Sequence, residues 1–130
     1  MSMQIVEKAD AMFGKMSYEF AVPEVKTEKE FYDLAYDIAG LENVDRIECK
    51  GYFDMDTHEN FATFKTRDDF RKNLSDVKKI EADSITIFFT GKDGLSRAKV
   101  AKGRVTHLYM TGKEPFINSV IALLKKKFSS

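Results

Sequence analysis

Four basic side chains stand among small residues in the stretch RAKVAKGRV, residues 97–105: Arg97, Lys99, Lys102 and Arg104. Lysine and arginine at this density can bind an anionic partner, either by steering an acidic protein surface or by contacting phosphates. The same spacing is also typical of the solvent side of a strand pair, because strand side chains alternate between two faces. These four residues form the binding site that the sequence predicts.

The register of this strand pair follows from its turn. With a two-residue turn at Lys102-Gly103, Lys99 would face Thr106. That register collects three of the basic residues on one face, and it sends the following residues to the other: Ala98, Val100, Val105, His107 and Tyr109. The sequence therefore predicts an amphipathic hairpin whose basic face meets a partner or the last helix.

A second group, Asp54, Asp56, His58 and Glu59, offers oxygen and nitrogen atoms that could bind a metal ion. A calcium-binding loop that began at Asp54 would need glycine at its sixth position and an acid at its twelfth. Those positions hold Glu59 and Lys65, so a polar hairpin loop is the simpler interpretation.

The single cysteine and the histidines predict no catalytic site. Cys49 alternates with Ile47 and Phe53 on one side of an expected strand, which predicts a buried, inert thiol. His107 lies between apolar neighbours, which favours a hydrogen-bonded core histidine over a catalytic base. The chain has no phosphate loop, serine-hydrolase elbow, HExxH zinc motif or dinucleotide fingerprint. A protein that binds, without a cofactor, fits these residues better than an enzyme does.

The composition is that of one folded domain over residues 1–130, with 43% hydrophobic and 32% charged residues. The longest apolar runs, such as VIALL at 120–124, are too short to span a bilayer, so we expect no membrane partner. The start of the chain has no apolar stretch of signal-peptide length. Together with the single cysteine, this predicts a cytoplasmic protein.

The charges are unevenly distributed along the chain. Residues 1–90 hold 12 Lys and Arg against 19 Asp and Glu, a net charge of −7, whereas residues 91–130 hold 9 against 2, a net charge of +7. Such asymmetry can mark a basic interaction surface. It can equally disappear if the two parts interleave in one sheet, where opposite charges become cross-strand neighbours.

Hydrophobic periodicity predicts alternating strands and helices. Thr27 and Glu30 form a capping box at the start of a helix that Gly40 ends, and Pro115 suits the first turn of a last, strongly apolar helix. The expected helices are 1–14, 27–40, a short one from Thr66 and one from Pro115; the expected strands are 16–22, 44–53, 60–65, 84–90, 96–101 and 104–110.

The first strand–helix order after residue 14 is β-α-β-β-α-β, which predicts a ferredoxin-like α+β core with two helices on one face of an antiparallel sheet. The C-terminal hairpin would extend this sheet. The final amphipathic helix would pack on the antiparallel sheet, across its other face. An alternative is a curved sheet around that helix, enclosing a ligand cavity lined by Tyr18, Phe88, His107 and Tyr109.

The layout of residues 16–90 resembles that of an RNA recognition motif. That family contacts RNA through a basic–Gly–aromatic run in its third strand. In the matching segment THENFATF, the basic, glycine and first aromatic positions hold Thr57, His58 and Glu59, and only Phe61 matches a stacking position. The resemblance therefore concerns the layout and does not extend to RNA binding.

The sequence leaves three functional hypotheses. The first is a non-catalytic interaction, inhibitor or immunity-like protein that binds an acidic protein through the basic hairpin. The second is a nucleic-acid binder that uses the same basic residues on phosphates. The third is a small-molecule carrier or enzyme with a cavity under the last helix. A homodimer is a further option, because the outermost strand of a sheet has a free edge.

Overall fold

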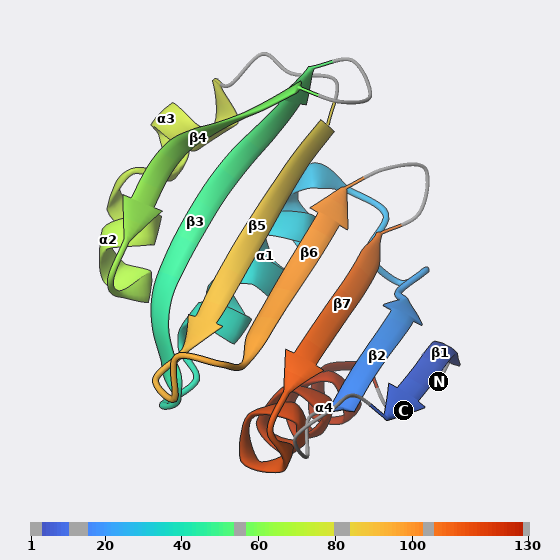
Figure 1. The fold of residues 1–130 in the computed structure, drawn as a ribbon. Coiled ribbons are helices and arrows are strands. Elements are labelled where there is room, and N and C mark those ends of the chain that lie inside the picture. The colour runs from blue at the N-terminus through green and yellow to red at the C-terminus, as the bar shows by residue number, and fades with distance from the viewer. Residues whose placement is uncertain (1–3, 11–15, 54–56, 80–83, 103–105, 129–130) are drawn as a thin grey trace.

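The computed structural model describes residues 4–10, 16–53, 57–79, 84–102 and 106–128. In these ranges the elements follow in the order β1 (Gln4–Asp10), β2 (Met16–Ala21), α1 (Glu28–Ala39), β3 (Val44–Phe53), β4 (Thr57–Phe64), α2 (Arg67–Lys72), α3 (Leu74–Lys78), β5 (Ser84–Gly91), β6 (Arg97–Lys102), β7 (His107–Gly112) and α4 (Glu114–Phe128). The strands form one antiparallel sheet in the order β1-β2-β7-β6-β5-β3-β4 (Figure 1). The predicted α+β class with an antiparallel sheet is confirmed.

The strand order does not confirm the ferredoxin-like arrangement. In a split βαβ unit, one strand lies between the two strands that a helix connects. Here β7, β6 and β5 all lie between β2 and β3, which α1 connects. The cause is the meander β5-β6-β7, in which each strand pairs with the next and β7 takes β2 as its second neighbour. The C-terminal hairpin therefore fills the centre of the sheet instead of extending it.

Residues 4–10 form a strand, so the helix predicted over residues 1–14 is wrong for the part of it that the structure describes. β1 pairs antiparallel with β2, with Gln4 opposite Ala21 and Asp10 opposite Met16. The apolar residues of so short a segment fit either period. Pairing with the otherwise free edge of β2 supplies backbone hydrogen bonds to both strands. This pairing favours a strand over a helix for the segment.

The capping box predicted for α1 is confirmed. Thr27 Oγ1 accepts a hydrogen bond from the Glu30 N–H at 3.1 Å, and Glu30 Oε1 accepts one from the Thr27 N–H at 3.1 Å. These two bonds satisfy backbone donors that the first helical turn leaves without partners. The apolar face of α1 is buried against the sheet and the other helices: Phe31, Tyr32, Leu34, Ala35, Ile38 and Ala39.

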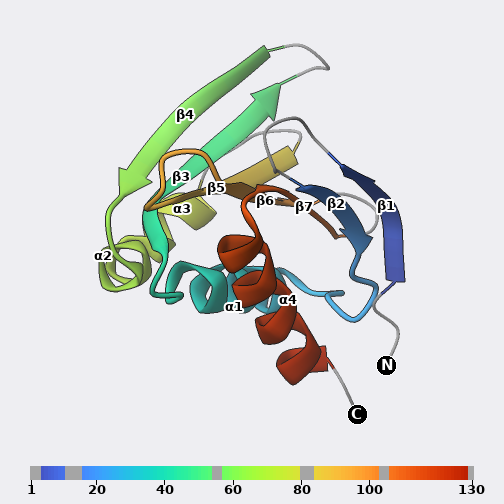
Figure 2. The same cartoon turned by 60° about the horizontal axis from the view of Figure 1, so that its bottom comes forward.

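The four helices in the described residues lie on the same side of the sheet, which corrects the predicted position of α4. Figure 2 shows α4 beside α1 beneath the sheet. The Lys127 ammonium lies 2.7 Å from the Asp37 carboxylate of α1, and the Asn43 amide donates to Ser119 Oγ at 3.2 Å. The buried residues of α4 are Phe116, Ile117, Val120 and Leu124. Amphipathicity required α4 to be covered, but it did not specify which face of the sheet would cover it.

The register of β6 and β7 differs from the predicted one by three residues. Lys99 is opposite Tyr109 rather than Thr106, and Arg97 is opposite Thr111 rather than Leu108. Because side chains alternate between the two faces of a strand, a register shift by an odd number of residues brings the opposite set of β7 side chains onto the face of Arg97 and Lys99. As a result, Leu108 and Met110 are buried on the helix side. His107, Tyr109 and Thr111 share the opposite side with Arg97 and Lys99.

Candidate functional site

The candidate site is the side of the sheet that none of the described helices covers. We call this side the open face, and its strands are β3, β5, β6, β7 and β2. Cross-strand pairing arranges its side chains in three rows. The first row is Arg46, Thr90, Arg97, Thr111 and Ser17; the second is Glu48, Phe88, Lys99, Tyr109 and Glu19; the third is Lys50, Thr86, Ala101, His107 and Ala21.

Lysine ammonium groups and aromatic rings alternate along the middle of the open face. The Lys99 Nζ lies 4.7 Å from the ring centroid of Tyr109 and 5.9 Å from that of Phe88. The Lys50 Nζ lies 4.7 Å from the same Phe88 ring. At these distances the cations are attracted by the ring quadrupoles. The two lysines and two rings thus form one connected group across β3, β5, β6 and β7.

An acidic side chain ends this group at β2. Glu19 Oε1 lies 3.2 Å from His107 Nδ1, and the Glu19 carboxylate also interacts with the phenol of Tyr109. The His107 and Tyr109 rings stack at 6.0 Å with an interplanar angle of 22°. Burial, followed by the hydrogen bond to Glu19 and its negative charge, raises the pKa of the Tyr109 phenol. Tyr109 is therefore a neutral hydrogen-bond donor at neutral pH.

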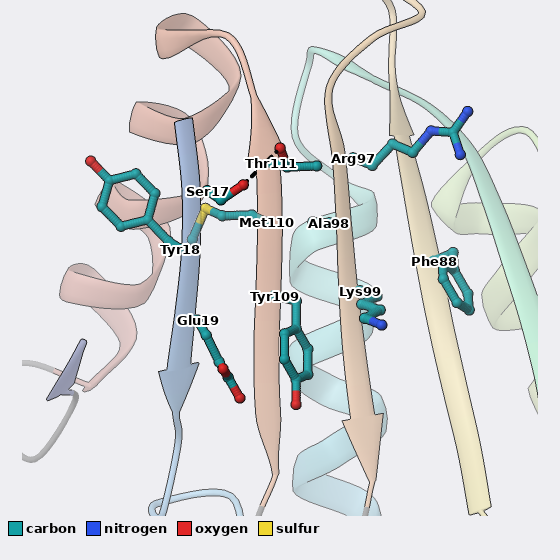
Figure 3. Close-up of a pocket in the computed structure, with 10 residues that line it drawn as sticks. All are labelled: Ser17, Tyr18, Glu19, Phe88, Arg97, Ala98, Lys99, Tyr109, Met110 and Thr111. Carbon is teal, nitrogen blue, oxygen red and sulfur yellow. Dashed lines mark hydrogen bonds between the residues drawn. The ribbon is translucent and has the colours of Figure 1, made fainter. Parts of the chain in front are cut away.

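A groove of about 360 Å³ runs across the strands of the open face. Figure 3 shows Ser17, Thr111 and Arg97 on one side of it and the Glu19–Tyr109–Lys99–Phe88 row on the other. Ser17 Oγ donates a hydrogen bond to Thr111 Oγ1 at 3.1 Å. Tyr18, Ala98 and Met110, which belong to the helix side, complete the lining between the two rows. The groove combines apolar surface with both cationic and anionic groups.

The structure brings together two of the four predicted site residues. Arg97 is exposed and Lys99 half-buried, and both belong to the open face. Lys102 lies at the end of β6 opposite Ile85, on the same side of the strand as buried Val100. Arg104 lies outside the described residues. The basic hairpin is therefore not one continuous site.

The residues predicted to line a cavity under the last helix lie mostly on the other side of the sheet, and several of them are in the groove. Phe88 and Tyr109 line the groove on the side opposite α4, and His107 lies next to Tyr109 on that side. Lys50 and Glu19 were not predicted. Strand alternation could have placed each on a face, but only cross-strand pairing shows that they meet Phe88 and Tyr109.

No catalytic pair forms between Cys49 and His107. Cys49 is fully buried on the helix side of β3, and burial raises the pKa of its thiol to about 12. His107 belongs to the open face with 33% of its side chain exposed, so the expected core histidine is wrong. The predicted burial of Cys49 is confirmed. Its inertness stays a prediction, which rests on the poor nucleophilicity of a protonated, inaccessible thiol.

The acidic segment 54–60 remains open as a metal site, because residues 54–56 lie outside the described residues. Among the residues that the structure does describe, no group of three His, Cys, Asp or Glu side chains could hold a metal ion. None of the described helices is long and apolar enough to cross a membrane.

Comparisons with protein families, curated proteins and solved structures find no match to this chain.

Proposed function

We propose that this protein is a non-catalytic binding module that holds an acidic segment of another protein against the open face of its sheet. The observation that carries the proposal concerns Lys50, Arg97 and Lys99. Lys50 projects from β3, Arg97 and Lys99 project from β6 across the intervening β5, and none of the three forms a salt bridge within the described part of the chain. Carboxylates of a partner would complement them and speed association. The proposed location is the cytoplasm, as the single cysteine suggested.

A protein segment fits this face better than a nucleic acid does. Glu19 and Glu48 lie in the same row as Lys99 and would repel the regularly spaced phosphates of a nucleic acid, whereas a peptide can place its carboxylates beside the cations alone. A peptide backbone carries both donors and acceptors, so it can also use the Glu19 carboxylate and the hydroxyls of Ser17 and Thr111. The net charge of zero over the whole chain points the same way, because nucleic-acid-binding domains are generally basic.

Single-stranded nucleic acid is the second candidate. The observation that favours it is the alternation of Lys50, Phe88, Lys99 and Tyr109 on an uncovered sheet face. Aromatic rings that stack bases and cations that contact phosphates are the usual means of binding single strands.

Calorimetric titration with unlabelled probes tests the proposal. The probes are a decaglutamate peptide, a decalysine peptide and a 12-nucleotide oligothymidylate. We expect the decaglutamate peptide to bind, and to bind more weakly as salt rises, because the Debye length falls from about 8 Å at 0.15 M to about 3 Å at 1 M. Binding of the oligothymidylate alone would replace the proposal with the second candidate, and absence of all binding at low salt would refute both.

A charge-matched pair of variants locates the site. The double variant Arg97→Glu/Lys99→Glu reverses two cations of the open face, and we expect it to weaken decaglutamate binding about tenfold or more. The control Lys92→Glu/Lys126→Glu has the same net charge, but its exposed positions lie in the β5–β6 turn and on α4. Equal losses in the two double variants would show that only the total charge matters and would contradict the proposed site.

A further inference from the structure

We infer that the acidic segment of the partner carries an aromatic side chain, and that this ring occupies the groove beside Phe88, Lys99 and Tyr109. The inference rests on the proposed binding of an acidic segment and specifies the chemistry of that segment.

The lining of the groove calls for an apolar group. The rings of Phe88 and Tyr109 contribute half-buried apolar surface, and the groove of about 360 Å³ is at the small end of the range of ligand pockets. Carboxylates pressed into it would lose water without gaining partners from the two rings. A segment made only of acids would therefore satisfy the cations but leave the groove without a favourable occupant.

The position of Lys99 favours an aromatic ring over an aliphatic side chain. Its ammonium group lies 4.7 Å from the Tyr109 centroid and 5.9 Å from the Phe88 centroid, so it already sits among π faces. An incoming ring can add one more π face to this cation. An aliphatic side chain in the same place would remove water from the ammonium group and offer no compensating attraction.

The surroundings of the groove fit the flanking parts of a peptide. Beyond the Phe88 ring, Lys50 supplies a second cation, and Arg97 lies exposed in the first row. At the β2 end, the Glu19 carboxylate can accept backbone N–H groups, and the Ser17–Thr111 pair offers hydroxyls. Cations on one side and acceptors on the other match an acidic chain that crosses the strands with one ring inserted.

Three peptides of equal charge test the inference by calorimetry: five glutamates on each side of a central phenylalanine, leucine or glycine. We expect the phenylalanine peptide to bind about tenfold tighter than the glycine peptide, because one ring is desolvated in the groove. The leucine peptide should bind with intermediate affinity. Equal affinities for all three would overturn this inference and leave the proposed function intact, whereas absence of binding by all three would refute the proposed function itself.

Two variants place the ring in the groove. Phe88→Ala should remove most of the preference for phenylalanine over glycine and leave the glycine peptide's affinity almost unchanged. Lys99→Gln, which removes the charge and leaves a shorter polar side chain, should abolish the preference for phenylalanine over leucine. The control Leu95→Ala truncates an apolar side chain that is 44% exposed in the β5–β6 turn, and it should retain both preferences. Unchanged preferences in Phe88→Ala and Lys99→Gln would place the ring elsewhere and overturn the inference.

Discussion

Replacing Gly112 with alanine should destabilise the fold strongly. Gly112 ends β7 with φ of 148°, a conformation that L side chains rarely adopt. An added Cβ would lie 2.5 Å from the Cα of Ser96, and closer still to that residue's Cβ and Oγ. Ser96 is fully buried, and its Oγ donates to Asp93 at 2.5 Å and accepts from the Lys113 N–H at 3.0 Å. The serine therefore cannot move aside without losing both bonds.

The expected cost follows from these two effects. Backbone strain at a positive φ costs about 1–3 kcal/mol, and overpacking costs about 1–3 kcal/mol. Gly112→Ala should therefore lower the free energy of unfolding by about 2–6 kcal/mol, a large share of the roughly 5–15 kcal/mol typical of a domain. Urea unfolding followed by far-ultraviolet circular dichroism measures this loss. We expect a lower urea concentration at the midpoint of unfolding, with an unchanged dependence of the unfolding free energy on urea concentration.

Gly94 provides the matched control. Its φ is also positive, at 74°, but an added Cβ would meet nothing within 4 Å. Gly94→Ala should therefore lower the free energy of unfolding by the cost of backbone strain alone, about 1–2 kcal/mol. If Gly112→Ala proves no more destabilising than Gly94→Ala, the packing of Ser96 against Gly112 is not what constrains this end of β7, and the reasoning fails.

Three further predictions concern the cap, the thiol and the Tyr109 phenol. Thr27→Ala should lower the free energy of unfolding by about 1 kcal/mol because the Glu30 N–H loses its partner, and Thr27→Ser should restore most of it in the same urea assay. Native Cys49 should not react with a disulfide reagent at pH 8, since its pKa is raised to about 12 and it is inaccessible; rapid reaction before unfolding would contradict its burial. Glu19→Gln should lower the pKa of Tyr109 towards its ordinary value, because a nearby negative charge disfavours the tyrosinate, while the contribution of burial remains. An alkaline titration of the Tyr109 ring signals by NMR measures that shift, and an unchanged pKa would exclude Glu19 as one of its causes.

Local signals in the chain predicted individual elements well. The Thr27–Glu30 pair specified the start of α1, because a capping box satisfies its donors within four residues. The alternation of Ile47 and Cys49 placed both on a buried strand face, where both are fully inaccessible. The predicted apolar face of α4 is also confirmed, because four of its residues are buried.

The candidate site was predicted only in part, because it depends on pairing between distant segments. A two-residue turn at Lys102-Gly103 was a reasonable local expectation, yet it placed Lys99 opposite Thr106. The actual pairing with Tyr109 moves that ring onto the face of Arg97 and Lys99. Glu19 joins them because β2 pairs with β7 across about ninety residues of chain.

The sequence by itself thus determined most of the strands after residue 16, the helices α1, α2 and α4, and the buried sides of α1, β3, β5 and α4, since these follow from periodicity and caps within a few residues. Only the tertiary structure decided the strand order, the register of β6 and β7, and the sheet face that α4 covers. The physical reason is that a helix with an apolar face is stabilised by any apolar surface of the right shape, and a strand edge can pair with any free edge. The choice among those partners is made by the whole core, and here it leaves Lys50, Phe88, Lys99 and Tyr109 together on an uncovered face.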